Sequence, residues 1–411
     1  MGLLTLTLAF ALIGSSVFFA AFYISVFLND ESKYSETVSL DSYPKLTIVM
    51  PAFNEEGVVR TSLSAVQNLD YPNYEVKFVD DGSTDGTLEI AKEMIDESIT
   101  EIIESSENEG KAAALNKGLD STDSEYMVVV DADSKVDGPL LKEAVETIEV
   151  DSNIGAVISA IMPLNSNTLV RRLQVVEYRL RDFYRNLMAD VQILDVTPGA
   201  FSMYRTRDLN DIGGFDVGNL TEDLEMAWSL RKHGRDIEMV RKKRSYTELP
   251  GTLKGLHNQR VRWARGHIQN LFKHKDMFFN SRYGWFGLFH MPATTMFAGF
   301  SILGFVMVLW GLGEQAYNLF ITFSSVGFKM PSLEFSLVRW LLALDMKVYV
   351  PLASSLGLTA YIMTKAYQGF GEDVKHPVAL AVYFFGYFMI KPVFWISAIL
   401  KELLRTKRTW T

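Results

Sequence analysis

The stretch EYMVVVDAD, residues 125–133, decides the fold, because an apolar run ends there in two closely spaced aspartates. Its methionine and three consecutive valines are typical of a strand that is buried on both faces of a sheet. Asp131 and Asp133 follow this run directly and are separated only by Ala132. Two carboxylates at the end of a buried strand predict a polar site at the edge of a sheet.

A stretch that reads as a strand and is followed by polar residues occurs twice more, earlier in the chain. Residues 46–51 (LTIVMP) and 74–79 (YEVKFV) predict two further strands. Helical spacing of apolar residues predicts helices after these strands, over residues 56–69, 87–95 and 111–118. Strands that alternate with helices predict an α/β domain with a doubly wound, mainly parallel sheet.

Polar side chains follow each of the three predicted strands. Asn54 and Glu55 come after the first strand, Asp80 and Asp81 after the second, and Asp131 begins the third group. Each group alone is typical of an ordinary Asp-rich turn. Because ligands of such sheets bind outside the carboxyl ends of the strands, three groups at one edge predict a shared binding site.

Asp131 and Asp133 suit a hard divalent cation. Mg²⁺ and Mn²⁺ prefer oxygen ligands, and two protein carboxylates leave coordination positions for phosphate oxygens and water. This donor set fits a nucleoside diphosphate. Lys111, which follows Gly110 at the start of a predicted helix, either faces a phosphate or is a solvated lysine. The chain has no GxxxxGK(S/T) phosphate loop, so a P-loop ATPase is unsupported.

The motif Thr221-Glu222-Asp223 precedes another helical pattern. One interpretation is an N-cap, in which Thr221 caps the helix and the acidic residues face the positive end of its dipole. The other is a catalytic one, because a carboxylate in this position could act as general base toward a hydroxyl. The two interpretations are compatible.

Two basic helical stretches accompany these motifs. In the stretch at residues 254–275, Gln259, Arg262 and Trp263 share one face; a tryptophan suits a sugar ring and an arginine suits a diphosphate. The alternative is an interfacial helix at the level of the lipid headgroups. Residues 168–190 have one apolar stripe with arginines on the remaining surface, which predicts a helix that covers the sheet or rests on the membrane.

The composition indicates a water-soluble domain joined to membrane segments. Of 411 residues, 48% are hydrophobic and 22% charged, and the mean hydropathy is +0.09. The chain has no cysteine, which excludes disulfides, Cys-based metal sites and thiol nucleophiles. The net charge of −9 indicates no nucleic-acid partner.

The apolar residues predict where the chain meets the bilayer. We expect an N-terminal membrane helix over residues 1–28, a cytoplasmic domain over 29–282 and a membrane region over 283–411 with a basic cytoplasmic tail. Spans are predicted at 285–313, 348–364 and 378–400. Residues 315–328 could form a short span, a re-entrant turn or an interfacial segment. Placing the tail in the cytoplasm favours counting them as a span, which gives five spans in a multi-pass cell-membrane protein rather than four.

Taken in order, the motifs resemble those of the processive, membrane-integrated family 2 glycosyltransferases, which include cellulose, chitin, hyaluronan and poly-β-1,6-N-acetylglucosamine synthases. The sequences of residues 221–234 and 249–266 most resemble those of the poly-β-1,6-N-acetylglucosamine synthases. The motifs are VMPAFNEE (49–56), VDDGSTDGT (79–87), NEGKAAALN (108–116), VVDADS (129–134), PGAFSMYR (198–205), GGFD (213–216), TEDLEMAWSLRKHG (221–234) and LPGTLKGLHNQRVRWARG (249–266).

The resemblance implies a nucleotide-sugar-binding domain of the glycosyltransferase A type with a mixed, mainly parallel sheet, plus transmembrane helices. It implies that Asp223, with Glu222, is the general base and that Asp133, with Asp131, binds Mg²⁺ or Mn²⁺. It assigns the nucleotide to Ala52, Asn54, Glu55, Asp80, Asp81, Lys111 and Asp131. It assigns the diphosphate and acceptor to Gly199, Ala200, Gln259, Arg262 and Trp263.

The implied activity is the inverting polymerisation of a β-linked polysaccharide from a UDP-sugar, UDP-GlcNAc, with passage of the growing polysaccharide across the lipid bilayer. An alternative is transfer of a single sugar to a lipid-linked acceptor. A second alternative is a transporter or scaffold that senses nucleotide.

The general-base assignment gives a first prediction. Asp223→Asn removes the proton acceptor but keeps the size of the side chain, so we expect nucleotide binding to persist while sugar transfer falls by about 10²–10⁴-fold. UDP binding and product formation by the purified variant check this. Product formation near the rate of the unmodified protein would contradict the assignment.

Overall fold

A computed structural model describes residues 38–326, 357, 360–367 and 376–406, together with Gly14, Phe18, Ala21, Phe22, Ser25 and Val26. The six early residues are helical. The remainder of the predicted span at 1–28, and most of the one at 348–364, lie outside the described residues.

The first half of the described sheet is parallel. Four strands lie side by side in the order β3 (Thr100–Glu104), β2 (Tyr74–Asp80), β1 (Leu46–Ala52) and β4 (Tyr126–Val129). Three of them confirm the strands predicted from the sequence. Neighbouring residues of β1 point to opposite faces, so Ile48 and Met50 enter one core and Val49 the other. A strand covered on both faces is apolar along its whole length, which explains LTIVMP.

The second half of the described sheet makes it mixed. The order continues with β7 (Ser202–Arg205), β6 (Ile154–Pro163), β8 (Asp236–Thr247) and β5 (Ser134–Lys135). β7 runs antiparallel to both of its neighbours, β4 and β6, and β5 is antiparallel to β8. β6 and β8 are parallel, which leaves four parallel and three antiparallel pairings among the described strands. The predicted α/β class and mixed sheet are therefore confirmed.

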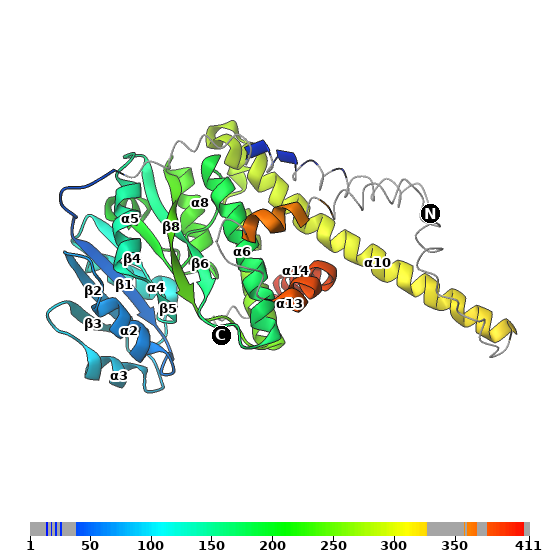
Figure 1. The fold of residues 1–411 in the computed structure, drawn as a ribbon, viewed down its shortest axis with the longest axis horizontal. Helices are drawn as coiled ribbons and strands as arrows, with labels where there is room; N and C mark the ends of the chain where they lie inside the picture. Colours follow the sequence, from blue (N-terminus) through cyan, green and yellow to red (C-terminus); the bar gives the residue numbers. More distant parts are fainter. Residues whose placement is uncertain are drawn as a thin grey trace.

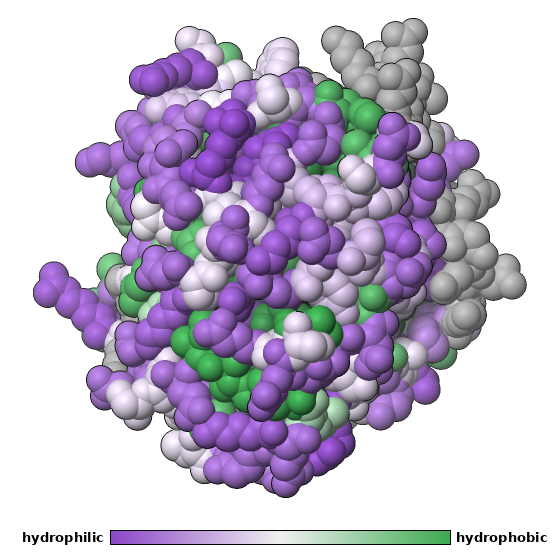
Figure 2. Space-filling model, turned by 90° about the vertical axis from the view of Figure 1, so that its left-hand side faces the viewer, coloured by the Kyte–Doolittle hydropathy of each residue, from purple (hydrophilic) through white to green (hydrophobic). Residues whose placement is uncertain are grey.

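Helices cover both faces of this sheet (Figure 1). The core that contains Ile48 is closed by α2 (Val59–Gln67), α3 (Thr87–Met94) and α5 (Gly138–Ile148). The core that contains Val49 is closed by three others, α4 (Lys111–Asp120), α7 (Thr206–Ile212) and α8 (Glu222–Lys232). The end of the domain that faces away from α10 is mostly hydrophilic, with a smaller apolar area (Figure 2).

Helix α6 (Leu169–Asp190) packs on β6 and β8, which confirms that it covers the sheet. Its arginines do not all lie on an open surface as predicted. Arg179 is 3% exposed, and its guanidinium lies 4.8 Å from the centroid of the Tyr367 ring. Arg185 is 5% exposed and lines a cavity between the helices and the sheet. The sequence showed where the arginines lie along the helix, but it did not show which residues from other parts of the chain would cover them.

The helices that follow the domain begin with α9 (Leu253–Lys273) and the short 3₁₀ turns η1 (Lys275–Met277) and η2 (Ser281–Tyr283). The π-helix η3 (Phe286–His290) leads into α10 (Met291–Val326), which projects from the domain (Figure 1). The chain ends with α13 (Pro377–Val382), the π-helix η4 (Tyr383–Tyr387) and α14 (Phe388–Leu403).

One helical stretch among the described residues, Phe286–Ser325, is long and apolar enough to cross a bilayer, judged by length and composition. It includes the predicted span at 285–313. A separate short span at residues 315–328 is wrong for the described part, because residues 315–326 continue α10 without a break. Gly311 and Gly313, which precede that segment, therefore lie inside a helix.

The contact between α4 and β1 gives a prediction for the fold. A Cβ at Gly118 of α4 would lie 2.3 Å from Cγ1 of the buried Val49. Alanine gains about 1 kcal/mol in helix propensity, but overpacking a filled core costs about 1–3 kcal/mol. We expect Gly118→Ala to lower the unfolding free energy of the full chain by about 1–2 kcal/mol in denaturant titration.

Gly57→Ala is the matched control, since a Cβ there would meet nothing within 4 Å. If Gly118→Ala is as stable as the control, β1 and α4 are not in close contact.

Candidate functional site

The ends of β1 and β2 are joined by hydrogen bonds that shape the loops beyond them. Asn54, which has a positive φ of 57°, accepts a hydrogen bond from the Thr84 amide at 2.8 Å, and its own amide donates to Ser83 Oγ at 3.1 Å. The Asp81 carboxylate accepts from the amides of Glu109 and Gly110, at 3.1 and 2.7 Å. These bonds fix the loop that places Lys111 at the start of α4.

The predicted nucleotide residues differ in how accessible they are. Ala52 is 3% exposed, and its carbonyl accepts from the Asp81 amide at 2.9 Å. Asp80 is buried, and its carboxylate accepts from the Ser83 amide at 3.1 Å, so it supports the turn from inside. Asn54 and Glu55 lie at the rim of this turn and remain partly or fully accessible. Their assignment to the nucleotide stays a prediction.

Lys111 is the centre of charge in the site. Its ammonium lies 2.5 Å from Asp131 at the end of β4 and 3.1 Å from Glu222 at the start of α8. Burial would lower the pKa of Lys111, but the two carboxylates, Asp131 first, raise it above its usual value. Glu222 is 3% exposed, and its Oε2 has no hydrogen-bond partner among the described residues. Lys111 is therefore the cation that compensates this buried carboxylate.

Gly199 allows this close packing. A Cβ on Gly199 would lie 2.2 Å from Lys111 Nζ and 2.5 Å from a carboxylate oxygen of Asp131, and the Asp131 amide donates to the Gly199 carbonyl at 2.9 Å. A side chain at position 199 would therefore displace the ion pair. The glycine of the PGA motif serves the site through its small size.

Asp133 is held from the second half of the sheet. Its Oδ1 accepts from the hydroxyls of Ser134 at 2.9 Å and Thr247 at 3.2 Å. Burial, with Asp131 as the next cause, raises the pKa of Asp133 to about 6. Burial, followed by repulsion from Asp133 and Asp131, raises the pKa of Glu55 to about 7.

The pKa values of these carboxylates bear on the predicted cation. Negative charge is concentrated around Asp133, and a divalent cation would relieve the repulsion that raises the pKa of Glu55. No group of three or more metal-binding side chains occurs among the described residues. The two aspartates therefore fit Mg²⁺ or Mn²⁺ only as a site that substrate oxygens and water complete.

Asp223 lies in the first turn of α8. Its side chain lines a cavity that Lys111, Asp131 and Asp133 also line. Its Oδ1 accepts from the Leu224 amide at 2.8 Å, and its carbonyl accepts from the Thr197 hydroxyl at 2.8 Å. Thr221 occupies the N-cap position, but its side chain makes no capping bond; it bonds to Asn219 instead, at 3.3 Å. The prediction that the Thr221 side chain caps the helix is therefore wrong.

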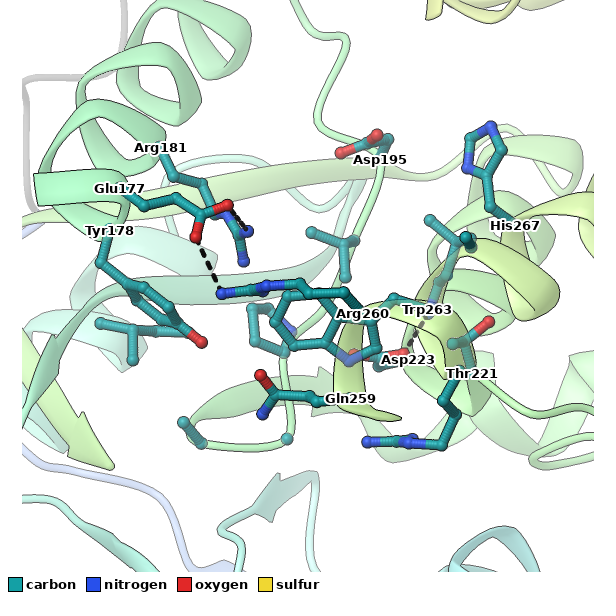
Figure 3. Close-up of a pocket in the computed structure, with 18 of the residues that line it drawn as sticks. Glu177, Tyr178, Arg181, Asp195, Thr221, Asp223, Gln259, Arg260, Trp263 and His267 are labelled. Carbon is teal, nitrogen blue, oxygen red and sulfur yellow. Dashed lines mark hydrogen bonds and ion pairs between the residues drawn. The ribbon is translucent and has the colours of Figure 1, made fainter. Parts of the chain in front are cut away.

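Helix α9 brings the three residues predicted on its face into the cavity. Gln259, Arg262 and Trp263 all line it. Arg262 donates to the Leu220 carbonyl at 3.2 Å, and the Gln259 Oε1 is buried with no hydrogen-bond partner among the described residues. The guanidinium of Arg260 lies 4.1 Å from the centroid of the Trp263 ring, and that of Arg181 lies 5.0 Å from it. Figure 3 shows Arg260 lying over the indole ring.

The sequence analysis missed a cluster around Glu177 of α6. This carboxylate accepts from Arg260 at 2.9 Å and from the Tyr387 hydroxyl at 2.8 Å, and it pairs with Arg181 at 3.3 Å. Burial would raise the pKa of Glu177, but the arginines, led by Arg260, hold it at about 2. The one sequence signal was that Glu177, like Asp182, is a carboxylate within a run of arginines. Nothing in the pattern pointed to Tyr387, which lies 210 residues away.

The cavity has a volume of about 690 Å³, within the usual range of about 300–1,000 Å³ for small-molecule sites. It joins two sets of residues that the sequence analysis kept apart. At one end are Lys111, Asp131 and Asp133, and at the other Tyr387 and Trp395. Ten of the predicted site residues line it, namely Lys111, Asp131, Asp133, Gly199, Ala200, Glu222, Asp223, Gln259, Arg262 and Trp263. Ala52, Asn54, Glu55, Asp80 and Asp81 lie outside this lining.

Comparison with known proteins gives two kinds of match. Residues 47–213 match the family described as Glycosyl transferase family 2. The poly-β-1,6-N-acetyl-D-glucosamine synthase of Staphylococcus epidermidis is 28% identical over 229 residues, which cover 56% of each chain. The same enzyme of Staphylococcus aureus strain MSSA476 is 27% identical over 263 residues, 63% of this chain and 64% of that one. The chain thus spans less than two thirds of the length of these relatives.

Among solved structures, the mannosyltransferase PcManGT from Pyrobaculum calidifontis, in complex with GDP-Man and Mn²⁺, matches with a TM-score of 0.64. It is 20% identical to this chain, and the match covers 98% of both chains. At this level of identity the match establishes a shared fold.

The ion pairs of Lys111 give a prediction for the site. Lys111→Met leaves Glu222 without its cation, so we expect the unfolding free energy to fall by about 2–4 kcal/mol, less than for a fully buried pair because Lys111 is partly exposed. The double variant Lys111→Met with Glu222→Gln should recover part of the loss, because a neutral amide replaces the uncompensated carboxylate. Denaturant titration of the full chain measures both changes.

Lys45→Met is the control, because it breaks ion pairs to Glu75 and Asp123 from a side chain that is 36% exposed. Its effect should stay below about 1 kcal/mol. An equally small effect of Lys111→Met would mean that Lys111 does not compensate Glu222.

Proposed function

Since residues 47–213 form a glycosyl transferase family 2 domain, we propose that this chain is an inverting hexosyltransferase that polymerises a β-linked polysaccharide from a UDP-sugar, UDP-GlcNAc. The observation that carries the proposal is the shared cavity. Asp133, Asp223 and Trp263 come from three separate motifs and line one space. A metal ligand, a base and an aromatic acceptor platform in one cavity are what glycosyl transfer requires.

In this proposal the donor nucleotide binds at the carboxyl ends of the parallel strands. Asn54, Glu55 and Asp81 form the rim there. Lys111 and Arg262 face the diphosphate from opposite sides, as the start of α4 and the face of α9 are both exposed to the cavity. Asp131 and Asp133 would hold the divalent cation, which would supply Lewis-acid stabilisation of the diphosphate oxygens.

The transfer is a single displacement. Asp223 accepts the proton of the acceptor hydroxyl, whose oxygen forms a bond to the anomeric carbon as the bond to the diphosphate oxygen breaks. The electron pair of the broken bond leaves on UDP, where Lys111 and Arg262 balance the charge. One displacement inverts the anomeric configuration, so an α-linked donor gives a β-linked product. Asp223 later releases its proton to water.

The acceptor occupies the other end of the cavity. The rings of Trp263, Tyr387 and Trp395 line this part, and aromatic rings pack well against the apolar faces of sugars. The cavity is bounded there by the C-terminal helices, which supports passage of the polymer toward the membrane. We place the catalytic domain at the cytoplasmic face of a multi-pass membrane protein, with the lipid bilayer around α10.

A donor screen tests the proposal. Membranes that contain the full chain are supplied with Mg²⁺ or Mn²⁺ and a panel of UDP- and GDP-sugars, and nucleotide release and product length are measured together. We expect UDP release from UDP-GlcNAc, a product of many sugars, and loss of both when the cation is chelated. Asp223→Asn membranes are the control.

The other outcomes separate the alternatives. If the product is a lipid-linked acceptor that carries one added sugar, the chain transfers single sugars and does not polymerise them. No nucleotide release from any donor would overturn the transferase and return the chain to the nucleotide-sensing transporter or scaffold. A preference for GDP-sugars would overturn the proposal that the donor is a UDP-sugar.

A further inference from the structure

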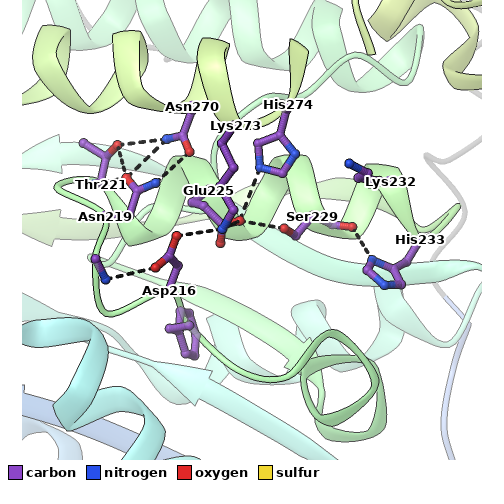
Figure 4. A network of polar contacts seen from close by, with 12 residues as sticks. Asp216, Asn219, Thr221, Glu225, Ser229, Lys232, His233, Asn270, Lys273 and His274 are labelled. Atoms are coloured by element: carbon purple, nitrogen blue, oxygen red, sulfur yellow. Dashed lines mark hydrogen bonds and ion pairs between the residues drawn. The ribbon is translucent and has the colours of Figure 1, made fainter. Parts of the chain in front are cut away.

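The second half of α9, together with His274 just after it, is bonded to the segment that carries Asp223, and Figure 4 shows the part of this contact made by Asn270, Lys273 and His274. This segment runs from residue 216 through the first turn of α8. The residues of α9 that contact it recur every three or four positions, so they form one stripe. They are Arg262, Gly266, Gln269, Asn270, Lys273 and His274.

The first attachment precedes the base. Asn270 is fully buried, and its side chain exchanges hydrogen bonds with Asn219 at 2.8 and 3.4 Å and donates to Thr221 Oγ1 at 3.3 Å. The Leu220 amide donates to Gln269 at 3.2 Å. The three residues before Glu222 are therefore held by side chains of α9, which explains why the Thr221 hydroxyl does not cap its own helix.

The approach of the two segments depends on a glycine. A Cβ on Gly266 would lie 2.2 Å from Oγ1 of Thr221 and 2.5 Å from its Cγ2. Any larger residue would push α9 away from the start of α8. The separation between the two elements is therefore set by direct contact.

The second attachment follows the base. Glu225 is 2% exposed, and its carboxylate accepts from Lys273 at 2.7 Å, from Ser229 at 2.8 Å and from the ring of His274 at 3.3 Å. Lys273 also reaches Asp216, at 2.6 Å. Lys273 thus joins the two ends of the segment to one point on α9.

The far side of α9 is fixed as well. Arg265 donates to Glu402 of α14 at 2.6 Å, and His257 lies 3.3 Å from the Ser397 hydroxyl. The helix is therefore tied on both sides and acts as a rigid support between the catalytic segment and the C-terminal helices.

We propose that Glu225, Lys273 and Asn270 are positioning residues that clamp the segment carrying Asp223 to α9, and so set the distance between the base and the diphosphate-binding Arg262. Asp223 lies two residues from each attachment, at Thr221 and Glu225, and Arg262 lies on the helix to which both are tied. The inference rests on the proposed transferase function. It assigns these three residues a role in the reaction although none of them lines the cavity.

The kinetic test uses Lys273→Met in the full chain. This variant removes both ion pairs of Lys273, so we expect kcat for transfer to fall by about 10–100-fold, because small displacements of a catalytic group are costly. The KM for the donor should stay within about twofold, since the strand ends that bind it are untouched. Lys273→Arg should restore kcat, because a guanidinium can still bridge Glu225 and Asp216.

The matched control is Lys232→Met. Lys232 also ties α8 to a later element, through Asp276 of η1 at 2.9 Å, but Asp276 is far more exposed than Glu225, and Lys232 lies at the far end of α8 from Asp223. We expect its kcat to be unchanged. Equal kcat for Lys273→Met and Lys232→Met would overturn the clamp, and so would a loss that Lys273→Arg does not restore.

A distance measurement tests the clamp without using activity. The chain has no cysteine, so spin labels on His233→Cys and Asn258→Cys, two exposed positions at the end of α8 and on α9, report on these elements alone. We expect a narrow distance distribution that broadens with Lys273→Met and not with Lys232→Met. If the distance distribution does not change in Lys273→Met, the clamp is overturned, whether or not the chain transfers sugar. If the distribution broadens in Lys273→Met but the unmodified chain transfers sugar from no donor, only the proposed transferase function is overturned.

Discussion

The ammonium of Lys111 between Asp131 and Glu222 is the contact on which the remainder of the site depends. The three residues come from the start of α4, the end of β4 and the start of α8. Glu222 is buried, and an uncompensated buried carboxylate is strongly destabilising. The ion pair between Lys111 and Glu222 therefore fixes where α8 begins, and it fixes the position of Asp223, which is the next residue. The buried charge therefore fixes Asp223 relative to the edge of the parallel sheet.

The same contact joins the two halves of the sheet. The parallel half contributes the strand ends that carry Asn54, Asp81 and Asp131. The second half contributes Thr247 of β8, which holds Asp133, and the loop of Gly199, which has no side chain to interfere with Lys111. A purely parallel sheet would have supplied the first set alone. The mixed topology therefore gives the site two walls.

Buried charge also connects the domain to the C-terminal helices. Glu177 of α6 binds Arg260 of α9 and Tyr387 at the end of η4, so one carboxylate joins three elements around the end of the cavity that Tyr387 and Trp395 line. Arg260 in turn lies over Trp263, which fixes the ring that the proposal gives to the acceptor. The loss of Glu177 would strongly destabilise the fold, because it would leave the buried guanidinium of Arg260 without this carboxylate.

The sequence by itself determined the features that depend on neighbours along the chain. Largely apolar runs predicted β1 and β4, because a strand covered on both faces needs mostly apolar residues, and the β-prone residues of YEVKFV predicted β2. The polar residues after these strands followed from the same pattern, and the shared face of Gln259, Arg262 and Trp263 followed from helical periodicity. The order of the motifs was enough to recognise the glycosyltransferase domain.

Only the tertiary structure decided which distant residues meet. Glu177 and Tyr387 are 210 residues apart, and Thr221 and Asn270 are 49 apart; no local pattern says which partner a buried polar group will find. Arg179, likewise, lies against the ring of Tyr367, which is far along the chain. The unbroken course of α10 up to residue 326 also differed from the separate segment predicted at 315–328, since the two glycines before it weaken a helix without ending it. Local energies choose the elements, whereas packing and the compensation of buried charge choose their neighbours.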